Sequence, residues 1–195
     1  MNSLTRSVII STLFVCAINC SKQRNILFKE FNDKLQKLEN IEEWKTRLRT
    51  EFGESLQKLP ENIKEMIIER ANKELNSTWQ QLLATDYLSY KMTGRRDLYE
   101  KKLFDRLTRL QVFVLAQALK PREEFLLEVA NGLWLVLEQS TWVWPAHMSL
   151  QIGGDGLPNP DQFIIDLGVG ETSAFVTWIG FLLGKNLFLT RSSSY

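Results

Sequence analysis

Apolar residues recur at three- and four-residue spacing on both sides of Pro121, and this repeat constrains the fold more than any other feature. Such spacing places apolar side chains along one face of an α-helix. Pro121 marks the start of the second helix, and Glu123 and Glu124 suit its first turn, where acidic side chains are favoured. The two apolar series are Leu98, Leu103, Leu107, Leu110 and Val114, then Phe125, Val129, Leu133, Val136 and Leu137. Because the connection is short, we expect the two helices to be antiparallel neighbours that form an αα-hairpin.

Another helical region follows Pro60, and polar residues interrupt its apolar series. This series consists of Ile63, Ile67, Ala71, Leu75 and Trp79. Residues 76–78, Asn-Ser-Thr, have side chains suited to a helix N-cap, so we expect one helix to end and the next to begin there. The second of these helices should end at Gly94, because glycine suits a helix C-cap. Trp79 is expected to lie in the core.

The N-terminal part of the chain has the pattern of a one-sided surface helix. Its apolar positions are Leu27, Phe31, Leu35, Leu38, Ile41, Trp44 and Leu48. Charged residues occupy the other positions, which is typical of a helix with one face in solvent. Gly53 is expected to end this helix before Leu59 and Pro60 open the next one.

The composition fits one helical domain. The chain has 195 residues, of which 44% are hydrophobic and 24% charged, with 10 glycines and 5 prolines. This length can fill one ordinary domain, and the small number of glycines and prolines indicates helices. Residues 148–163 are the exception, because glycine, proline and asparagine concentrate there and predict a loop. We therefore predict an all-α fold built from antiparallel αα-hairpins, with a long loop of the kind that often carries function.

The segment Glu138–His147 is the most specific part of the sequence. Pro145 has no amide hydrogen and disfavours a helical conformation at Trp144, so the preceding helix should stop a few residues earlier. Trp142 and Trp144 then share a rigid loop with His147, the only histidine. Indole faces pack on the C–H faces of pyranose rings, and polar groups bind the hydroxyls. The segment therefore predicts the rim of a saccharide-binding groove.

Several ordered motifs carry a family resemblance. They are Tyr87-Leu88 through Met92-Thr93-Gly94-Arg95-Arg96 and Tyr99-Glu100, then Glu138–His147, then Ile165-Asp166-Leu167, Gly170-Glu171-Thr172-Ser173-Ala174 and Trp178-Ile179-Gly180-Phe181-Leu182-Leu183-Gly184. These motifs resemble the N-terminal helical domain of the heparinase II/III-like polysaccharide lyases. The resemblance covers roughly Leu75 to Leu187, and several motifs in order are more specific than one.

The resemblance implies a fold, an activity and a substrate class. The fold would be part of an incomplete α/α toroid. Members of the family cleave uronic-acid-containing polysaccharides by β-elimination, which needs a base and neutralisation of an enolate-like intermediate. The implied substrate-binding residues here are Glu138, Trp142, Trp144 and His147. The family's catalytic Asn or His and its Tyr lie downstream of the tryptophan-rich motif. We therefore assign no catalytic residue, regard the chain as the front part of a lyase, by natural truncation or an incomplete reading frame, and expect no turnover from it alone.

The same residues allow alternatives. The chain could be a self-standing, non-catalytic helical domain that binds carbohydrate or serves as a scaffold. His147 could take part in proton transfer, line a cleft or simply anchor its loop. Trp142 and Trp144 could stack on sugars or form a structural wall. Arg95 and Arg96 could clamp an anion, but a solvated helix entrance is the simpler interpretation.

Other chemistries lack the residues that they need. Glu138, Asp166 and Glu171 include a potential carboxylate pair for glycoside hydrolysis, but their spacing defines no common face, and Glu171 suits a helix start. There is no Gly-rich phosphate loop or nucleophile elbow, and one histidine does not make a metal cluster. We expect no cofactor and no metal. With 24 basic and 23 acidic residues and a net charge of +1, we expect no nucleic-acid partner, and the resemblance implies an acidic polysaccharide instead.

The first twenty residues predict export. Arg6 precedes an apolar run from Val8 to Ile18, as in a signal peptide. Cys20, followed by Ser21, resembles the acylated cysteine of a bacterial lipoprotein, so lipidation at Cys20 and a plain signal peptide both remain open. The expected organisation is a signal segment 1–20 and a helical domain 21–195, in the periplasm or at the outer membrane, with a lipid anchor as the only membrane attachment.

The C-terminal part predicts one more helix and a tail. The helix should begin near Gly170 and contain about a dozen uninterrupted apolar or small residues after Glu171, fewer than the roughly twenty that a membrane span needs. We expect it to be buried between neighbouring helices. Residues 188–195 are low in complexity and are expected to be disordered.

Overall fold

The computed structural model describes residues 40–162 and 164–188, and every described element is a helix. The prediction of an all-α fold is therefore confirmed for this part of the chain, whereas closure into a toroid stays a prediction. The chain divides into two compact units, residues 1–47 and 48–195. Of the first unit, only the start of helix α2 (Ile41–Gln57) is described, where the Asn40 side chain accepts a hydrogen bond from the Glu42 amide at 2.9 Å.

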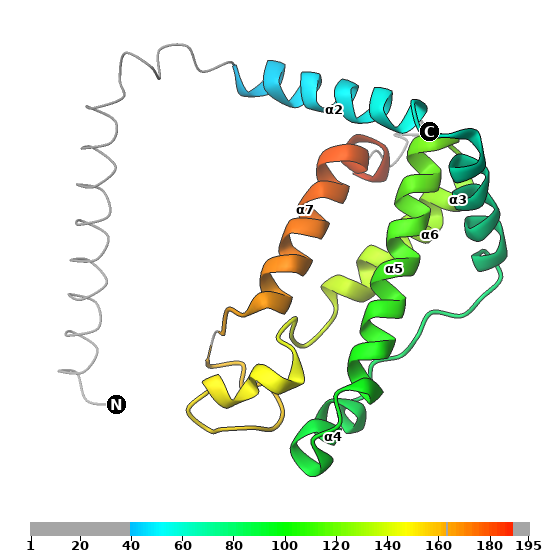
Figure 1. Cartoon of the computed structure of the whole chain (residues 1–195). Helices are drawn as coiled ribbons and strands as arrows, with labels where there is room; N and C mark the ends of the chain where they lie inside the picture. Colours follow the sequence, from blue (N-terminus) through cyan, green and yellow to red (C-terminus); the bar gives the residue numbers. More distant parts are fainter. Residues whose placement is uncertain (1–39, 163, 189–195) are drawn as a thin grey trace, which may run out of the picture. The chain divides into compact units, whose positions relative to one another are not determined.

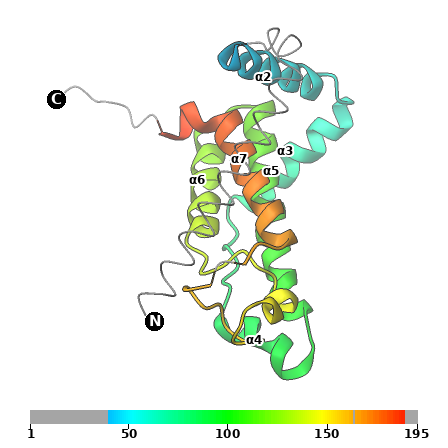
Figure 2. The same cartoon turned by 90° about the vertical axis from the view of Figure 1, so that its left-hand side faces the viewer.

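The second unit is organised around the predicted hairpin of α5 (Asp97–Leu119) and α6 (Glu123–Leu137) (Figure 1). The two helices pack against each other as antiparallel neighbours, as the short connection predicts. The Gln117 side chain accepts a hydrogen bond from the Arg122 amide at 2.9 Å and so closes the turn. Helix α3 (Glu61–Glu74) packs on α5, and α7 (Leu167–Phe188) contacts both α5 and α6 (Figure 2).

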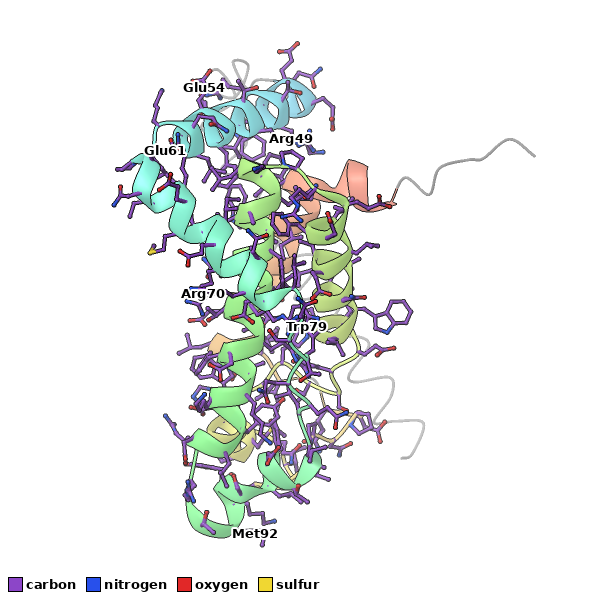
Figure 3. The ribbon with its side chains drawn as sticks, turned by 90° about the vertical axis from the view of Figure 1, so that its right-hand side faces the viewer. Arg49, Glu54, Glu61, Arg70, Trp79 and Met92 are labelled. Carbon is purple, nitrogen blue, oxygen red and sulfur yellow. The ribbon has the colours of Figure 1, made fainter. Side chains whose placement is uncertain are left out.

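The main core lies where these four helices meet. Its fully buried side chains include Leu110, Phe113, Phe125, Val129, Val136 and Ile179. The α5–α6 contact is close because α6 has a glycine there. A Cβ atom at Gly132 would lie 2.6 Å from Cη2 of Trp79 and 2.8 Å from Cδ1 of Leu110. Trp79 is half-buried against this core, as predicted (Figure 3).

A second, smaller core lies where α4 (Ala84–Thr93) and the 3-10 helix η1 (Pro145–Leu150) contact each other near the start of α5 (Figure 2). Its buried members are Tyr87, Tyr99, Leu103, Val143 and Met148. The rings of Tyr87 and Tyr99 meet edge to face with centroids 4.8 Å apart, a favoured aromatic geometry. This second core carries the residues of the tryptophan-rich corner.

Several predicted boundaries are correct and others are wrong. Gly94 ends α4 with φ of 72° and its amide bonded to the Tyr90 carbonyl, as expected of a C-cap. However, α2 continues through Gly53, because a single glycine costs only about 1 kcal/mol inside a helix. The predicted N-cap at residues 76–78 is also wrong, because the chain stays non-helical from Ser77 to Leu83 before α4 begins.

Helix α7 differs from its prediction in length and burial. It begins at Leu167 rather than near Gly170 and contains 22 residues. By length and composition, its segment Leu167–Gly184 could cross a membrane, which the shorter sequence estimate had excluded; core helices of soluble proteins meet the same criterion. Ile179 and Leu183 are buried against the main core, but Trp178 on another face is 46% exposed. The helix is thus buried on one face and not between neighbours on all sides.

Some predictions concern residues outside the described ranges. They are the signal segment 1–20 with Cys20, the apolar stripe from Leu27 to Leu38, and the tail after Phe188. Phe188 itself, placed in the tail by the sequence, is the last residue of α7.

Candidate functional site

A pocket of about 490 Å³ opens directly beside the end of α6. The residues Glu138-Gln139-Ser140-Thr141, which begin the tryptophan-rich segment, form one wall. The opposite walls come from the non-helical segment after α3, from α4 and α5, and from the long loop. Among the other lining residues are Leu82, Tyr87, Tyr99, Arg106, Leu135 and Pro158. The lining is mostly apolar with a few polar groups, which is the usual composition of a site for a small organic ligand.

Arg106 is the only cationic side chain that lines this pocket among the described residues. It is 5% exposed, and its guanidinium donates to the carbonyl oxygens of Leu135, at 3.3 Å, and of Gln80. Its Nε has no hydrogen-bond partner in residues 40–162 and 164–188, and no carboxylate there forms an ion pair with it. Burial lowers the pKa of Arg106 because it disfavours the charged form, while the nearby Tyr99 acts in the opposite direction. The pocket therefore contains a buried positive charge that only carbonyl dipoles offset.

Two tyrosines supply neutral polar groups. The Tyr87 hydroxyl donates to the carbonyl oxygen of Val143 at 2.8 Å and so fixes the position of the loop after α6. Burial raises the pKa of Tyr99 to about 12 and raises the pKa of Tyr87 as well. Both phenols are therefore protonated near neutral pH and can donate hydrogen bonds. At that pH, Arg106 and Glu138 are the only charged groups among the described lining residues.

Gln139 and Glu138 form the edge of the pocket at the end of α6. Both polar side-chain atoms of Gln139 are buried and have no hydrogen-bond partner within the described part of the chain. Native structures contain few such groups, so each one needs an explanation, and a ligand is one of the usual ones. Glu138 is exposed and lines the same pocket, so it can accept hydrogen bonds from hydroxyl groups.

The two predicted tryptophans have different surroundings. The indole N–H of Trp142 donates to the Val136 carbonyl at 2.8 Å, and the ring packs against the main core. Trp142 therefore caps the end of α6. Trp144 packs edge to face with Phe104 at 5.7 Å, and a Cβ atom at Gly168 would lie 2.5 Å from its indole nitrogen. Both rings are half-buried, and neither lines the pocket.

His147 is held by a carboxylate that the sequence did not pair with it. Its Nδ1 lies 2.6 Å from Oδ2 of Asp166, and its ring stacks on Trp144 with centroids 5.6 Å apart. Because a carboxylate accepts, Nδ1 carries the proton in the neutral ring and Nε2 is the free nitrogen. Asp166 also accepts from the amides of Trp144, at 3.1 Å, and of Val169, at 2.9 Å, so it caps the start of α7.

Several charges combine at Asp166. Burial acts to raise the pKa of this carboxyl, but hydrogen bonds from the Val169 amide, from His147 and from the Trp144 amide outweigh it and lower the pKa below its ordinary value. The Asp166 side chain is 3% exposed and the His147 side chain 28%. The pair thus joins the tryptophan-rich loop to α7 and leaves one edge of the imidazole accessible.

A second pocket of about 450 Å³ adjoins the first. The two share Ser140, Thr141 and Pro158 as lining residues, so they lie on either side of this part of the chain. Asn159 and Gln162 of the long loop add polar groups to the second pocket. The two pockets together provide a depression with room for more than one sugar unit.

Two alternatives from the sequence find different outcomes. Arg95 forms a bidentate pair with Asp97, with nitrogen–oxygen distances of 3.1 and 2.6 Å, at the exposed start of α5. The guanidinium of Arg96 lies over the Tyr90 ring at 5.8 Å. Neither residue lines a pocket described here. No group of three His, Cys, Asp or Glu side chains close enough to hold a metal ion is found among residues 40–162 and 164–188.

No model of a known protein family matches the chain, and no curated protein matches it.

The structure thus brings together a set of residues that differs from the predicted one. Of the four predicted substrate-binding residues, Glu138 lines the pocket, whereas Trp142, Trp144 and His147 form the loop behind it. Arg106, Gln139 and Tyr99 were not among the predicted site residues. Arg106 did carry a signal, because it occupies the core-facing side of α5, three residues after Leu103 and four before Leu110. A charge at a core position is rare unless it is paired or functional.

Proposed function

We propose that this chain is the N-terminal helical part of a heparinase II/III-like polysaccharide lyase and forms one wall of the groove that binds a uronic-acid-containing polysaccharide. The observation that carries the proposal is the pocket of about 490 Å³ whose wall is the Glu138–Thr141 segment. This segment opens the most specific motif of the resemblance. A saccharide groove beside that motif is what the resemblance implies.

The lining of the pocket supports a saccharide as the ligand. Tyr87, Tyr99 and Leu82 offer apolar surface for the C–H faces of a pyranose ring. Glu138 and the Ser140 and Thr141 hydroxyls can bond to sugar hydroxyls. The partly exposed edge of His147 and the second pocket would bind further units of the same polymer.

An exposed apolar stripe on α6 supports a role within a larger helical assembly. Leu127, Trp134 and Leu137 lie at helical spacing and are 59%, 67% and 59% exposed. In a toroid, each hairpin packs its outer face against the next one. An isolated scaffold domain would have no need of such a surface.

Binding measurements test the proposal. Isothermal titration of the full chain with oligogalacturonate, heparan and chondroitin oligosaccharides should give saturable binding to at least one of them. Glu138→Ala should weaken that binding about tenfold, whereas Glu123→Ala, an exposed change at the other end of α6, should not alter it. If none of the three polymers binds, the proposal is wrong.

Turnover is a separate question. The family's base and acid lie beyond the motifs that this chain shares, so we expect no absorbance at 232 nm from β-elimination products with the chain alone. Turnover by the chain alone would refute its assignment to a non-catalytic wall.

A further inference from the structure

The charge of Arg106 lacks the partner that its burial requires. An isolated buried charge costs several kcal/mol unless an opposite charge or several hydrogen bonds compensate it. Arg106 has two carbonyl partners, from Gln80 and Leu135, and a buried Nε–H that remains without an acceptor in the described part of the chain. Arg109, one turn further along the same helix, forms an ion pair with Glu128 at 2.9 Å. The fold thus can supply a carboxylate to a buried arginine on α5, and it does so for Arg109 but not for Arg106.

The surroundings of Arg106 favour a particular kind of anion. The lining contains one cation, Arg106, and one acid at its edge, Glu138, so a dianion such as phosphate would meet an unfavourable balance of charge. A singly charged carboxylate would balance Arg106 and can accept hydrogen bonds from two donors at once. Gln139 offers an unpartnered amide, and Tyr99 offers a hydroxyl that makes no hydrogen bond to the described residues.

We propose that the pocket beside Ser140 binds the carboxylate group of a hexuronate unit on Arg106, with Gln139 and Tyr99 as additional donors. The identity of the ligand as a sugar rests on the proposed function, whereas the carboxylate site rests on Arg106 alone. The pyranose ring lies against the tyrosine pair, and Glu138 accepts from a ring hydroxyl. Arg106 then determines specificity, because the same sugar with a hydroxymethyl group in place of the carboxylate leaves the guanidinium unpaired.

Nuclear magnetic resonance titration of the full chain tests this site directly. The probes are glucuronate and galacturonate, the matched neutral sugars glucose and galactose, and acetate as a bare carboxylate. Both uronates should shift the Nε–H resonance of Arg106, which Arg106→Gln identifies by its disappearance. The uronates should bind at least tenfold more tightly than the neutral sugars. Arg106→Gln should remove this preference, whereas Arg95→Gln, which changes an arginine outside the pocket, should keep it.

A second pair of variants guards against a folding defect. Arg106 also bonds to the carbonyls of Gln80 and Leu135, so Arg106→Gln could unfold the chain, which circular dichroism would reveal. In that case Gln139→Leu and Tyr99→Phe replace it, because neither side chain makes a hydrogen bond within the described residues. Each should weaken uronate binding severalfold without changing the binding of the neutral sugar. Unchanged uronate affinity in both would overturn the site.

The outcomes separate the two proposals. Equal binding of uronates and neutral sugars would overturn the carboxylate site and support a saccharide groove. Binding of acetate with no response to any sugar would support the carboxylate site at Arg106 and overturn the groove. No response to any of the five probes would overturn both.

Discussion

Arg109 and Arg106 lie one turn apart on the same helix, both nearly buried, and their surroundings differ in one respect. Arg109 has Glu128 at 2.9 Å and Glu74 at 3.9 Å, and its guanidinium lies over the Trp79 ring at 4.2 Å. Arg106 has carbonyl partners only. Both arginines fix the non-helical segment after α3, because Arg109 donates to the carbonyls of Glu74 and Ser77 and Arg106 to that of Gln80.

The difference separates a structural charge from a charge available for binding. Around Arg109 the indole N–H of Trp79 also donates to Glu128 at 3.0 Å, so the carboxylate is shared between two donors inside a closely packed region. Around Arg106 there is a pocket, and the adjacent Gln139 has two unpaired polar atoms. Two arginines of similar burial can therefore have opposite roles, and the presence or absence of a carboxylate distinguishes them.

The largest expected effect comes from making Arg109 resemble Arg106. Glu128→Ala removes the main carboxylate of Arg109 and the acceptor of Trp79, so we expect the free energy of unfolding to fall by about 3 kcal/mol. Glu138→Gln, which neutralises an exposed carboxylate in the pocket, should change it by less than about 0.5 kcal/mol. Urea unfolding monitored by circular dichroism measures both. Similar losses in the two variants would remove the distinction between the regions.

Close packing around Trp79 gives the next effect. Gly132→Ala places a methyl group within 3 Å of Trp79 and Leu110, and we expect a loss of about 2 kcal/mol from overpacking. Gly180→Ala is the matched control, because a Cβ atom there meets nothing within 4 Å inside α7. It should stabilise the chain by up to about 1 kcal/mol through helix propensity. Thermal unfolding of the two variants should therefore shift in opposite directions, and a shift in the same direction would show that the α5–α6 contact can relax.

The helical hairpin was predictable because its signals are local. The apolar spacing along residues 98–137, the proline before α6 and the glycine after α4 each act within a few residues, and the structure agrees with them. The non-helical segment after α3 was not predictable in the same way. Arg106 and Arg109 hold its carbonyl groups from 26 to 35 residues away, so tertiary contacts override the helical pattern of Leu82 and Leu83.

The candidate site was predictable only in part. Glu138 was named from its motif, and it does line the pocket. The pairing of His147 with Asp166 joins residues 19 apart across an irregular loop, and no spacing rule gives that contact. Arg106 could have been singled out as a charge on the apolar side of α5, but its lack of a carboxylate partner is visible only in three dimensions.

The pair behind the pocket should make stability depend on pH. The folded pKa of Asp166 is below its ordinary value near 4, so its contribution is fully present above about pH 4 and is lost as the pH falls through the lower folded pKa. Asp166→Ala should cost about 1.5 kcal/mol at pH 7, because α7 loses its cap and His147 its acceptor. The deficit should shrink toward pH 2. Asp161→Ala, an exposed loop change, should show neither effect, and a deficit independent of pH would contradict the assignment.

The smallest effect concerns the two tryptophans and sharpens the contrast between support and site. Trp142→Phe loses the hydrogen bond to the Val136 carbonyl but keeps an aromatic ring, so we expect a loss of about 1 kcal/mol in stability. Since Trp142 does not line the pocket, uronate affinity should stay unchanged once the variant is folded. Tyr99→Phe should give the reverse result, with near-wild-type stability and weaker uronate binding. A variant pair in which stability and affinity fall together would mean that the wall and the pocket are one cooperative unit, and the roles assigned to Arg109 and Arg106 could then not be separated by mutation.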